Sequence, residues 1–285
     1  MKLYIPPHDL ARYWWRTRQS FHLDQHQLAP RWSELDGTLP AHNHLGVFFT
    51  ACDSIYFDQY AENYISSIAT SGGGQSVHIH VYNGDDERLA HAVRFGCERG
   101  VRVSATRDVR PDAALYSAFL FAAGRFVILP LVLRACASPL ICTDIDVLIR
   151  GSFDRSIELL CESDVSLHLR PASSLPWRKV LASTVIAMPT GSSQHFFGCV
   201  AETLADILRL PVRHHVDQII LFWAYRQGRA AGRHTVRFAS MDKRLIDWDF
   251  GRASLMWNAK GPERKPAYWD AVNAAQHCRG TSAGE

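Results

Sequence analysis

Residues 139–154 read PLICTDIDVLIRGSFD, and this stretch decides how the rest of the chain is interpreted. Two short apolar runs, residues 140–142 and 147–149, flank Asp144-Ile145-Asp146. An apolar run bounded by turn residues indicates a buried strand of an α/β sheet. The two carboxylates then lie at or just beyond the carboxyl end of that strand, where open α/β sheets bind ligands.

Asp144 and Asp146 project to the same side of an extended segment, so their carboxylates can converge on one point. Two anions that close repel by roughly 2–4 kcal/mol at an effective dielectric constant near 20, and apolar surroundings make it costlier to keep both ionised. A divalent cation removes this conflict, and oxygen ligands suit Mn²⁺ or Mg²⁺. The simpler alternative is a solvated acidic turn, because a bare Asp-x-Asp occurs often by chance.

The apolar strand, the Asp144-Ile145-Asp146 turn, Gly151 and Phe153-Asp154 together resemble the Asp-x-Asp region of nucleotide-sugar glycosyltransferases with the GT-A fold. The resemblance is greatest to the family 8 retaining enzymes and extends over about residues 45–266. It implies a single α/β, Rossmann-like domain of the nucleotide-diphospho-sugar transferase type, with a mainly parallel central sheet flanked by helices. It also implies that Asp144 and Asp146 bind the metal ion and that Asp144 contributes to donor binding.

Composition and size are those of a globular α/β protein. The 285 residues suffice for one large domain with a substantial core. A net charge of +3 without a Lys/Arg block argues against nucleic acid as a partner. The seven cysteines lack Cys-x-x-Cys spacing, which predicts free thiols in a reducing compartment rather than a zinc ribbon. We find neither a signal-peptide pattern nor a transmembrane segment of ~18 apolar residues, so a cytoplasmic location is expected.

Three regions follow from the distribution of residue types. Residues 1–44 form an N-terminal extension, residues 45–275 the GT-A domain, and residues 276–285 a flexible tail. The extension interleaves aromatic residues such as Trp14 and Trp15 with arginines. A helix packed on the domain is the preferred interpretation. A surface for an acceptor or partner and a peripheral membrane contact remain open.

The domain alternates between apolar runs and helical stripes. The predicted strand–helix–strand–helix–strand order is residues 45–52, 57–68, 77–81, 87–97 and 101–103. This order predicts a parallel sheet with right-handed crossovers. Residues 112–135 are predicted to be helical with interruptions at Gly124 and Pro130. The later predicted elements are strands at 165–169 and 181–187 and helices at 192–208 and from 214 onwards.

Asp53 ends the first predicted strand, within Ala51-Cys52-Asp53. Family 8 enzymes have a similar Ala-x-Asp turn that contacts uracil and ribose, so the resemblance implies a donor-binding role for Asp53. The alternative, and compatible, role is to cap the next helix. Arg125-Phe126 resembles the family's Arg-Phe segment, whose Arg reaches the donor phosphate or sugar. The alternative for Arg125 is a surface arginine with its stem packed on the domain.

Asp217-Gln218 resembles the Asp-Gln pair of the family, in which Asp holds sugar hydroxyls and the Gln amide lies near the anomeric carbon. We therefore predict Asp217 and Gln218 as the catalytic pair, whereas judged alone they are typical of a helix cap. The predicted strand at 181–187 departs from the family. Where the family has Asn-x-Gly against the donor sugar, this chain has Ala182-Ser183-Thr184, and the sugar specificity does not follow from the resemblance.

Residues 255–266, LMWNAKGPERKP, resemble the family's His-x-x-Gly-x-x-Lys-Pro segment. The resemblance implies that Gly261 and Lys265 contact the diphosphate. Asn258 stands where the family has its metal-binding His, and one extra residue separates Gly261 from Lys265. An amide oxygen can still bind a hard cation, although more weakly than a carboxylate. The alternative is a surface loop with a proline turn.

The resemblance implies a metal-dependent, retaining glycosyltransferase that moves a hexose-type sugar from a nucleotide diphosphate, most simply UDP. Its acceptor is an unidentified glycan, lipid-linked or protein hydroxyl. A sugar nucleotidyltransferase would share the half-sheet and the acidic residues but needs a glycine-rich loop after the first strand, where Asp53-Ser54 stands. A catalytically silent scaffold is the other alternative, and the departures at Ala182 and Asn258 motivate it.

Overall fold

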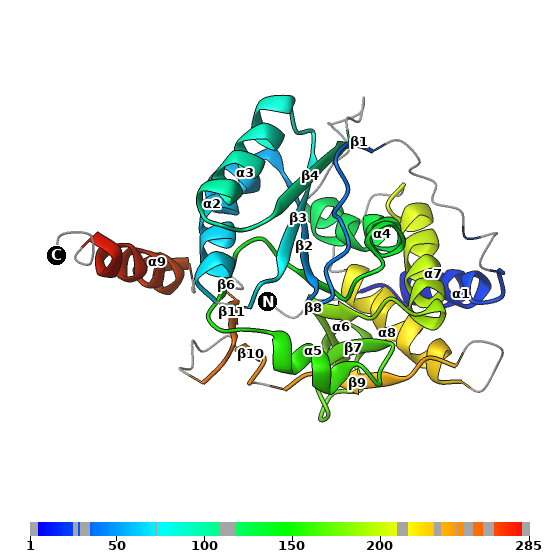
Figure 1. The fold of residues 1–285 in the computed structure, drawn as a ribbon. Helices are drawn as coiled ribbons and strands as arrows, with labels where there is room; N and C mark the ends of the chain where they lie inside the picture. Colours follow the sequence, from blue (N-terminus) through cyan, green and yellow to red (C-terminus); the bar gives the residue numbers. More distant parts are fainter. Residues whose placement is uncertain are drawn as a thin grey trace.

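The computed structural model describes residues 5–24, 28, 35–71, 73–108, 118–209, 216–230, 235–242, 244–247, 253–258 and 265–280. Within these ranges the chain forms one large and one small sheet with helices around them (Figure 1). The large sheet contains β1 (Asp36–Gly37), β2 (Val47–Asp53), β3 (Ser76–Tyr82), β4 (Val103–Asp108), β5 (Leu140–Thr143), β7 (Val165–Leu169), β8 (Val180–Ala187) and β9 (Phe238–Ser240). The small sheet contains β6 (Val147–Ile149), β10 (Ile246–Asp247) and β11 (Met256–Asn258).

The large sheet has the strand order β1-β4-β3-β2-β5-β8-β7-β9. Neighbours from β4 through β3 and β2 to β5 run parallel, as the alternation of apolar runs and helical stripes predicts. Strand β8 runs antiparallel to both β5 and β7, and β9 lies parallel to β7. The α/β fold with a mainly parallel central sheet is therefore confirmed.

Helices cover both faces of the large sheet. They are α1 (Pro7–Ser20), α2 (Ser54–Ser71), α3 (Asp86–Glu98), α4 (Ala118–Cys136), α5 (Asp154–Leu160), α6 (Pro176–Lys179), α7 (Gly191–Ile207), α8 (Val216–Arg229) and α9 (Lys265–Gly280). In Figure 1, α2 and α3 lie on one side of the sheet, and α4, α7 and α8 lie on the other. This arrangement places an apolar core on each face.

Strand β2 illustrates why its sequence is apolar throughout. Phe49 faces the core beneath α4, α7 and α8, whereas Phe48 faces the core beneath α2 and α3. Successive side chains of a strand point to opposite faces, so a strand covered on both faces needs apolar residues at every position. Both phenylalanines are fully buried.

Helix α4 continues through Gly124 and Pro130, so the predicted interruptions are wrong. Gly124 permits a close approach, because a Cβ atom there would lie 2.4 Å from the Tyr82 hydroxyl oxygen. A proline inside a helix costs about 3 kcal/mol through its lost N–H and its clash with the preceding turn. Fully buried neighbours such as Leu129 and Leu133 offset that cost by packing in the core.

Helices α1 and α9 lie on opposite sides of the domain in Figure 1. Helix α1 packs on α7 and α8 and buries Tyr13 and Thr17 while leaving Trp15 exposed. Helix α9 starts against the domain, where Tyr268 is fully buried. It then extends to Gly280, into the range predicted as a tail, and residues 281–285 lie outside the described residues.

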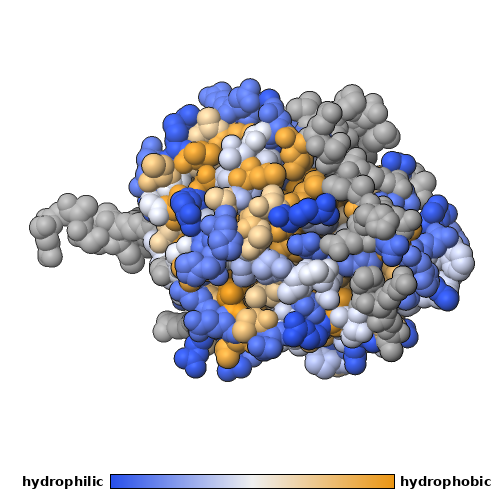
Figure 2. Space-filling view, turned by 45° about the vertical axis from the view of Figure 1, so that its right-hand side comes forward, coloured by the Kyte–Doolittle hydropathy of each residue, from blue (hydrophilic) through white to orange (hydrophobic). Residues whose placement is uncertain are grey.

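The surface has no single apolar face in the view of Figure 2, where orange patches are broken up by hydrophilic side chains. Large exposed apolar residues such as Ile55 and Leu159 lie on separate helices. Within the described ranges, no helix combines the length and apolar character needed to cross a bilayer.

Candidate functional site

A cavity of about 220 Å³ lies at the carboxyl end of β2 and β5. Its lining combines side chains from β2, α2, α4, the turn after β5, β8, α8 and β11. Most of the site residues predicted from the sequence line it: Asp53, Arg125, Asp144, Asp146, Asp217, Gln218 and Asn258. Lys265 joins them through an ion pair with Asp146, and Gly261 lies outside the described residues.

The turn with Asp144 and Asp146 connects the two sheets. Strand β5 ends at Thr143 and β6 begins at Val147, and the Asp144 N–H donates a hydrogen bond to the Ser183 carbonyl oxygen over 3.1 Å. Both aspartates line the cavity, and the Asp146 side chain is only 16% exposed. The alternative of a fully solvated acidic turn is therefore wrong.

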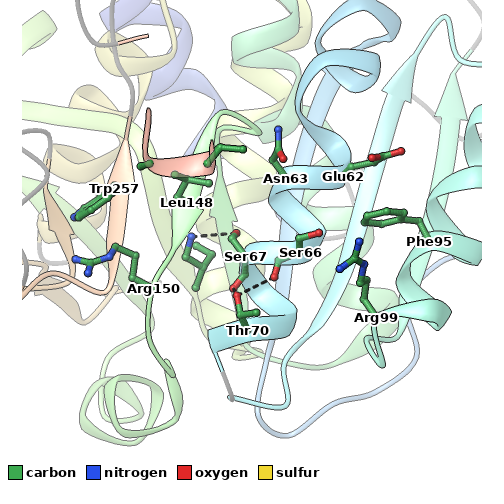
Figure 3. A pocket seen from close by; sticks show the side chains of 13 residues that line it. Glu62, Asn63, Ser66, Ser67, Thr70, Phe95, Arg99, Leu148, Arg150 and Trp257 are labelled. Atoms are coloured by element: carbon green, nitrogen blue, oxygen red, sulfur yellow. Dashed lines mark hydrogen bonds between the residues drawn. The ribbon is translucent and has the colours of Figure 1, made fainter. Parts of the chain in front are cut away.

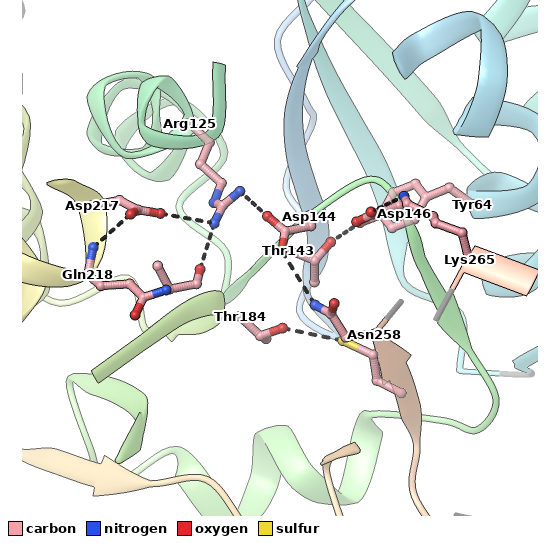
Figure 4. A network of polar contacts seen from close by, with 12 residues as sticks. Tyr64, Arg125, Thr143, Asp144, Asp146, Thr184, Asp217, Gln218, Asn258 and Lys265 are labelled. Carbon is pink, nitrogen blue, oxygen red and sulfur yellow. Dashed lines mark hydrogen bonds and ion pairs between the residues drawn. The ribbon is translucent and has the colours of Figure 1, made fainter. Parts of the chain in front are cut away.

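Arg125 is buried at the centre of the cluster (Figure 4). Its guanidinium forms an ion pair with Asp144 and donates from Nη2 to the Ala182 carbonyl oxygen over 2.7 Å. The same Nη2 lies 3.9 Å from an oxygen of Asp217. Burial is the largest single effect and would lower the pKa of Arg125, but Asp144, Cys142 and Asp217 together outweigh it and the pKa is raised. Because Arg125 is only 2% exposed, the alternative of a surface arginine is wrong.

Lys265, the first residue of α9, donates from Nζ to Asp146 Oδ2 over 2.6 Å. Burial is the largest single effect and would lower the pKa of Lys265, but Asp146 and Tyr60 together outweigh it and the pKa is raised. Burial, followed by Asp144, raises the pKa of Asp146 although Lys265 opposes that shift. The raised pKa of Asp146 favours its neutral form, whereas the raised pKa of Lys265 favours its charged form. The short Nζ–Oδ2 distance supports an ion pair between two charged partners.

Asn258 ends β11 and is paired with Val147 of β6. Its Nδ2 donates a long hydrogen bond of 3.4 Å to Asp144 Oδ2. Its Oδ1 atom is buried without a hydrogen-bond partner among the described residues, as is Ser183 Oγ. Because buried polar atoms are almost always paired, unpaired ones that line a cavity indicate a ligand.

Asp217 and Gln218 lie in the first turn of α8, and both are buried. Asp217 Oδ1 accepts a hydrogen bond from the Gln218 N–H over 2.8 Å. The long ion pair with Arg125 links Asp217 to Asp144, which belongs to the other half of the sheet. The structure therefore brings the two segments to one cavity, and the roles of the two side chains stay predictions.

Asp53 is the last residue of β2, and its Oδ1 accepts a hydrogen bond from the Tyr56 N–H over 2.7 Å. This bond caps the start of α2, so the capping role considered from the sequence is confirmed. Asp53 also lines the cavity. Because the helix cap uses only Oδ1, it is compatible with the predicted role of Asp53 in donor binding.

The sequence did not identify several lining residues. Phe121 and Ala122 of α4, Tyr56 of α2 and Ser183 of β8 also face the cavity. Ser183 belongs to the Ala182-Ser183-Thr184 segment that departs from the family pattern, and this departure was the only signal for it. The aromatic and apolar members carry no motif.

A second cavity, of about 400 Å³, lies over the outer face of α2 (Figure 3). Its walls include Arg99, which directly follows α3, and Arg150, whose guanidinium lies 3.9 Å from the ring centre of Trp257. None of the predicted site residues lines it. Neighbouring residues of β11 thus serve different cavities: Trp257 lines this one and Asn258 the first.

We find no match between the sequence and any protein-family model or curated protein. The fold, however, is similar to that of solved glycosyltransferases. GlyE of Streptococcus pneumoniae TIGR4 aligns with a TM-score of 0.57 and 13% identity, over 82% of this chain and 60% of the GlyE chain. The galactosyltransferase LgtC, in complex with donor and acceptor sugar analogues, aligns with a TM-score of 0.56 and 12% identity, over 80% of this chain and 95% of LgtC.

At such low identity the similarity concerns the fold alone. The chain has the α/β fold of GT-A glycosyltransferases, and it spans about 60% of the length of GlyE.

Proposed function

We propose that this protein is a glycosyltransferase that moves a hexose-type sugar from UDP to an acceptor hydroxyl with the help of a divalent metal ion. The observation that carries the proposal is the convergence of Asp144, Asp146 and the unpaired Asn258 oxygen in one cavity at the carboxyl end of a parallel sheet. Open α/β sheets bind ligands at this edge. The fold shared with solved glycosyltransferases supports the same reaction class.

The oxygen atoms of this cluster fit Mn²⁺ or Mg²⁺. Asp144 and Asp146 offer carboxylate oxygens, and Asn258 offers a buried amide oxygen that has no partner among the described residues. No cluster of three His, Cys, Asp or Glu residues is present in the described part of the chain, so the third protein ligand of this proposed site is the Asn258 amide. When bound, the ion supplies positive charge to the leaving diphosphate.

The other residues of the cavity position the substrate in this proposal. Asp53 orients the nucleotide, and Lys265 and Gly261 contact the diphosphate. Asp217 and Gln218 hold the sugar, with Gln218 beside the anomeric carbon. The proposed outcome is retention, with the acceptor attacking from the side that the diphosphate leaves.

Arg125 supports the donor indirectly in this proposal. Its two terminal nitrogens are engaged by Asp144, Ala182 and Asp217, and a guanidinium in such a fork holds its partners in fixed positions. It therefore orients the carboxylates of the metal site and of the sugar site relative to each other. We expect its loss to disturb both.

A screen of UDP-sugars with Mn²⁺ tests the proposal, with slow release of free sugar and UDP as the readout. We expect one or a few donors to be hydrolysed, because a glycosyltransferase without its acceptor transfers to water at a low rate. The control substitution is Asp86→Asn, because the Asp86 side chain is 88% exposed and does not line the cavity. This variant should hydrolyse the same donors as wild type. UDP binding without hydrolysis of any donor would favour a silent scaffold, and pyrophosphate formation from UTP and a sugar 1-phosphate would favour a nucleotidyltransferase.

A further inference from the structure

Lys265 contacts Asp146, one of the two carboxylates of the proposed metal site (Figure 4). Its Nζ lies 2.6 Å from Asp146 Oδ2. The same ammonium lies 4.4 Å from the ring centre of Tyr60 and 5.5 Å from that of Tyr56. Aromatic faces attract a cation at these distances, so the two tyrosines and Asp146 together hold the ammonium at one carboxylate of the proposed metal site.

The other carboxylate is paired as well, but with a partner of a different kind. Asp144 forms its ion pair with Arg125, which is buried and bound to Ala182 and Asp217 too. Arg125 is therefore fixed in its position within the cluster. Lys265 keeps a quarter of its side chain exposed, and a lysine stem has several rotatable bonds, so Lys265 is the movable cation of the pair.

A divalent ion and the Lys265 ammonium cannot both bind Asp146 closely. Two positive charges about 4 Å apart repel by several kcal/mol at an effective dielectric constant near 20, and Asp146 has little solvent to screen them. A diphosphate placed next to the metal ion offers the lysine a new anionic partner. Metal binding then depends on whether the Lys265 ammonium lies at Asp146 or at the diphosphate.

Building on the proposed function, we propose that Lys265 is an internal competitor of the divalent cation at Asp146, and that the nucleotide diphosphate relieves this competition by drawing the lysine to itself. The cation alone binds weakly, because it must displace the ion pair without compensation. The cation and the diphosphate together bind tightly. The lysine thereby couples the two ligands, and such coupling is reciprocal.

Direct measurement of Mn²⁺ binding tests this role without any turnover. Free Mn²⁺ is measured by electron paramagnetic resonance during titration of wild type and of Lys265→Met, each with and without UDP. Methionine keeps an apolar stem against Tyr56 and Tyr60 but carries no charge. We expect Lys265→Met to bind Mn²⁺ alone at least about tenfold more tightly than wild type, and we expect UDP to increase Mn²⁺ affinity less in the variant than in wild type.

Two further variants make the result specific. Lys179→Met removes a partly buried lysine whose ammonium donates a hydrogen bond to the Pro171 carbonyl oxygen and which does not line the cavity, and it should leave Mn²⁺ binding unchanged. Lys265→Gln repeats the test with a polar neutral side chain, and melting temperatures establish that each variant is folded.

The outcomes separate this inference from the proposed function. If wild type binds Mn²⁺ and UDP together but neither Lys265 variant binds Mn²⁺ alone more tightly, the competition is refuted and the proposed function stands. If wild type fails to bind Mn²⁺ even with UDP present, the metal site and the competition are both refuted.

Discussion

Two buried polar clusters of this domain differ in their charge and in what surrounds them. The first lies between β3 and β4, where His78 Nδ1 is 2.9 Å from Ser104 Oγ and His80 Nδ1 is 3.0 Å from Thr106 Oγ1. Burial lowers the pKa of His78 to about 3, so its imidazole is neutral at pH 7. Neither histidine lines the cavity at the carboxyl end of the sheet.

The second cluster joins Asp144, Asp146, Arg125 and Lys265 across that cavity. It is charged, and buried oxygen atoms of neighbouring side chains have no partner among the described residues. The comparison teaches that buried polar residues alone do not indicate function. A neutral cluster with its hydrogen bonds made within the sheet stabilises the fold, whereas a charged cluster with unpaired atoms around a cavity is suited to bind a ligand.

The substitution Asp146→Ala, in the charged cluster, is expected to have the largest effect on activity. Without this carboxylate the cation loses a ligand, and turnover should fall at least about a hundredfold. Burial and Asp144 raise the pKa of Asp146, so ionising this carboxyl in the fold lowers the free energy of unfolding. This loss is absent below the pKa of Asp146 in the unfolded chain and grows as pH rises above that pKa. The melting temperature of the apo variant at pH 7 should therefore equal or exceed that of wild type.

Initial rates with a UDP-sugar and a thermal melt without ligands check both parts of this prediction. A variant with full transfer activity would defeat the metal assignment. A large drop in melting temperature would show instead that Asp146 belongs with the stabilising residues of the fold.

The β3–β4 cluster should respond to acid rather than to ligands. Because folding lowers the pKa of His78 from 6.5 to about 3, the unfolded chain binds its proton first. Stability is therefore complete above about pH 6.5 and is lost as pH falls through the window down to about 3, by up to about 1.4 kcal/mol per pH unit. His78→Gln should remove this contribution to the slope and leave UDP binding at pH 7 unchanged.

Urea denaturation of wild type and His78→Gln at several pH values between 4 and 7 measures that slope. Equal slopes in the two proteins would mean that folding does not change the pKa of His78, and the account of a buried histidine held neutral by the fold would have to be abandoned.

The smallest effects are expected from a matched pair of single-hydroxyl removals. Ser183 Oγ lines the cavity without a partner among the described residues, whereas Thr106 Oγ1 pairs with His80 over 3.0 Å. Ser183→Ala should weaken donor binding by about three- to tenfold with no loss of stability, since it removes a hydrogen bond that forms only with the ligand. Thr106→Val should lower stability by about 1 kcal/mol and leave donor binding intact.

Isothermal titration with the donor and urea denaturation give both numbers for both variants. If the two substitutions acted alike, the proposed distinction between a binding cluster and a stabilising cluster would fail at the level of single atoms.

The fold could be predicted largely because its signals are local. The apolar run before Asp144 and the helical stripe from Phe57 to Ile68 each report on burial within a few residues, and both elements form where expected. Asp144 and Asp146 do line one cavity, but they lie in the turn between β5 and β6 and not in an extended segment, so their i, i+2 spacing does not account for it. Helix α4 differed because its continuity through Pro130 depends on packing from distant segments.

The ion pairs within the site could not be predicted either, because they join residues that are far apart in the sequence. Lys265 and Asp146 are 119 residues apart in the sequence, and no periodicity connects them. Arg125 stands among apolar residues in the middle of α4, a position that in retrospect indicates an inward-facing charge with an acidic partner. Resemblance to a family suggested which ligands these residues contact, but it did not suggest that they neutralise each other.

The most direct test is the dependence of UDP affinity on the metal ion, measured by calorimetry for wild type and for Asp146→Asn with Mn²⁺ or with a chelator. We predict that Mn²⁺ strengthens UDP binding to wild type by at least about tenfold and does so little or not at all in the variant. A wild-type protein that binds UDP equally well with Mn²⁺ and with the chelator would contradict a cation shared between Asp144, Asp146 and the diphosphate.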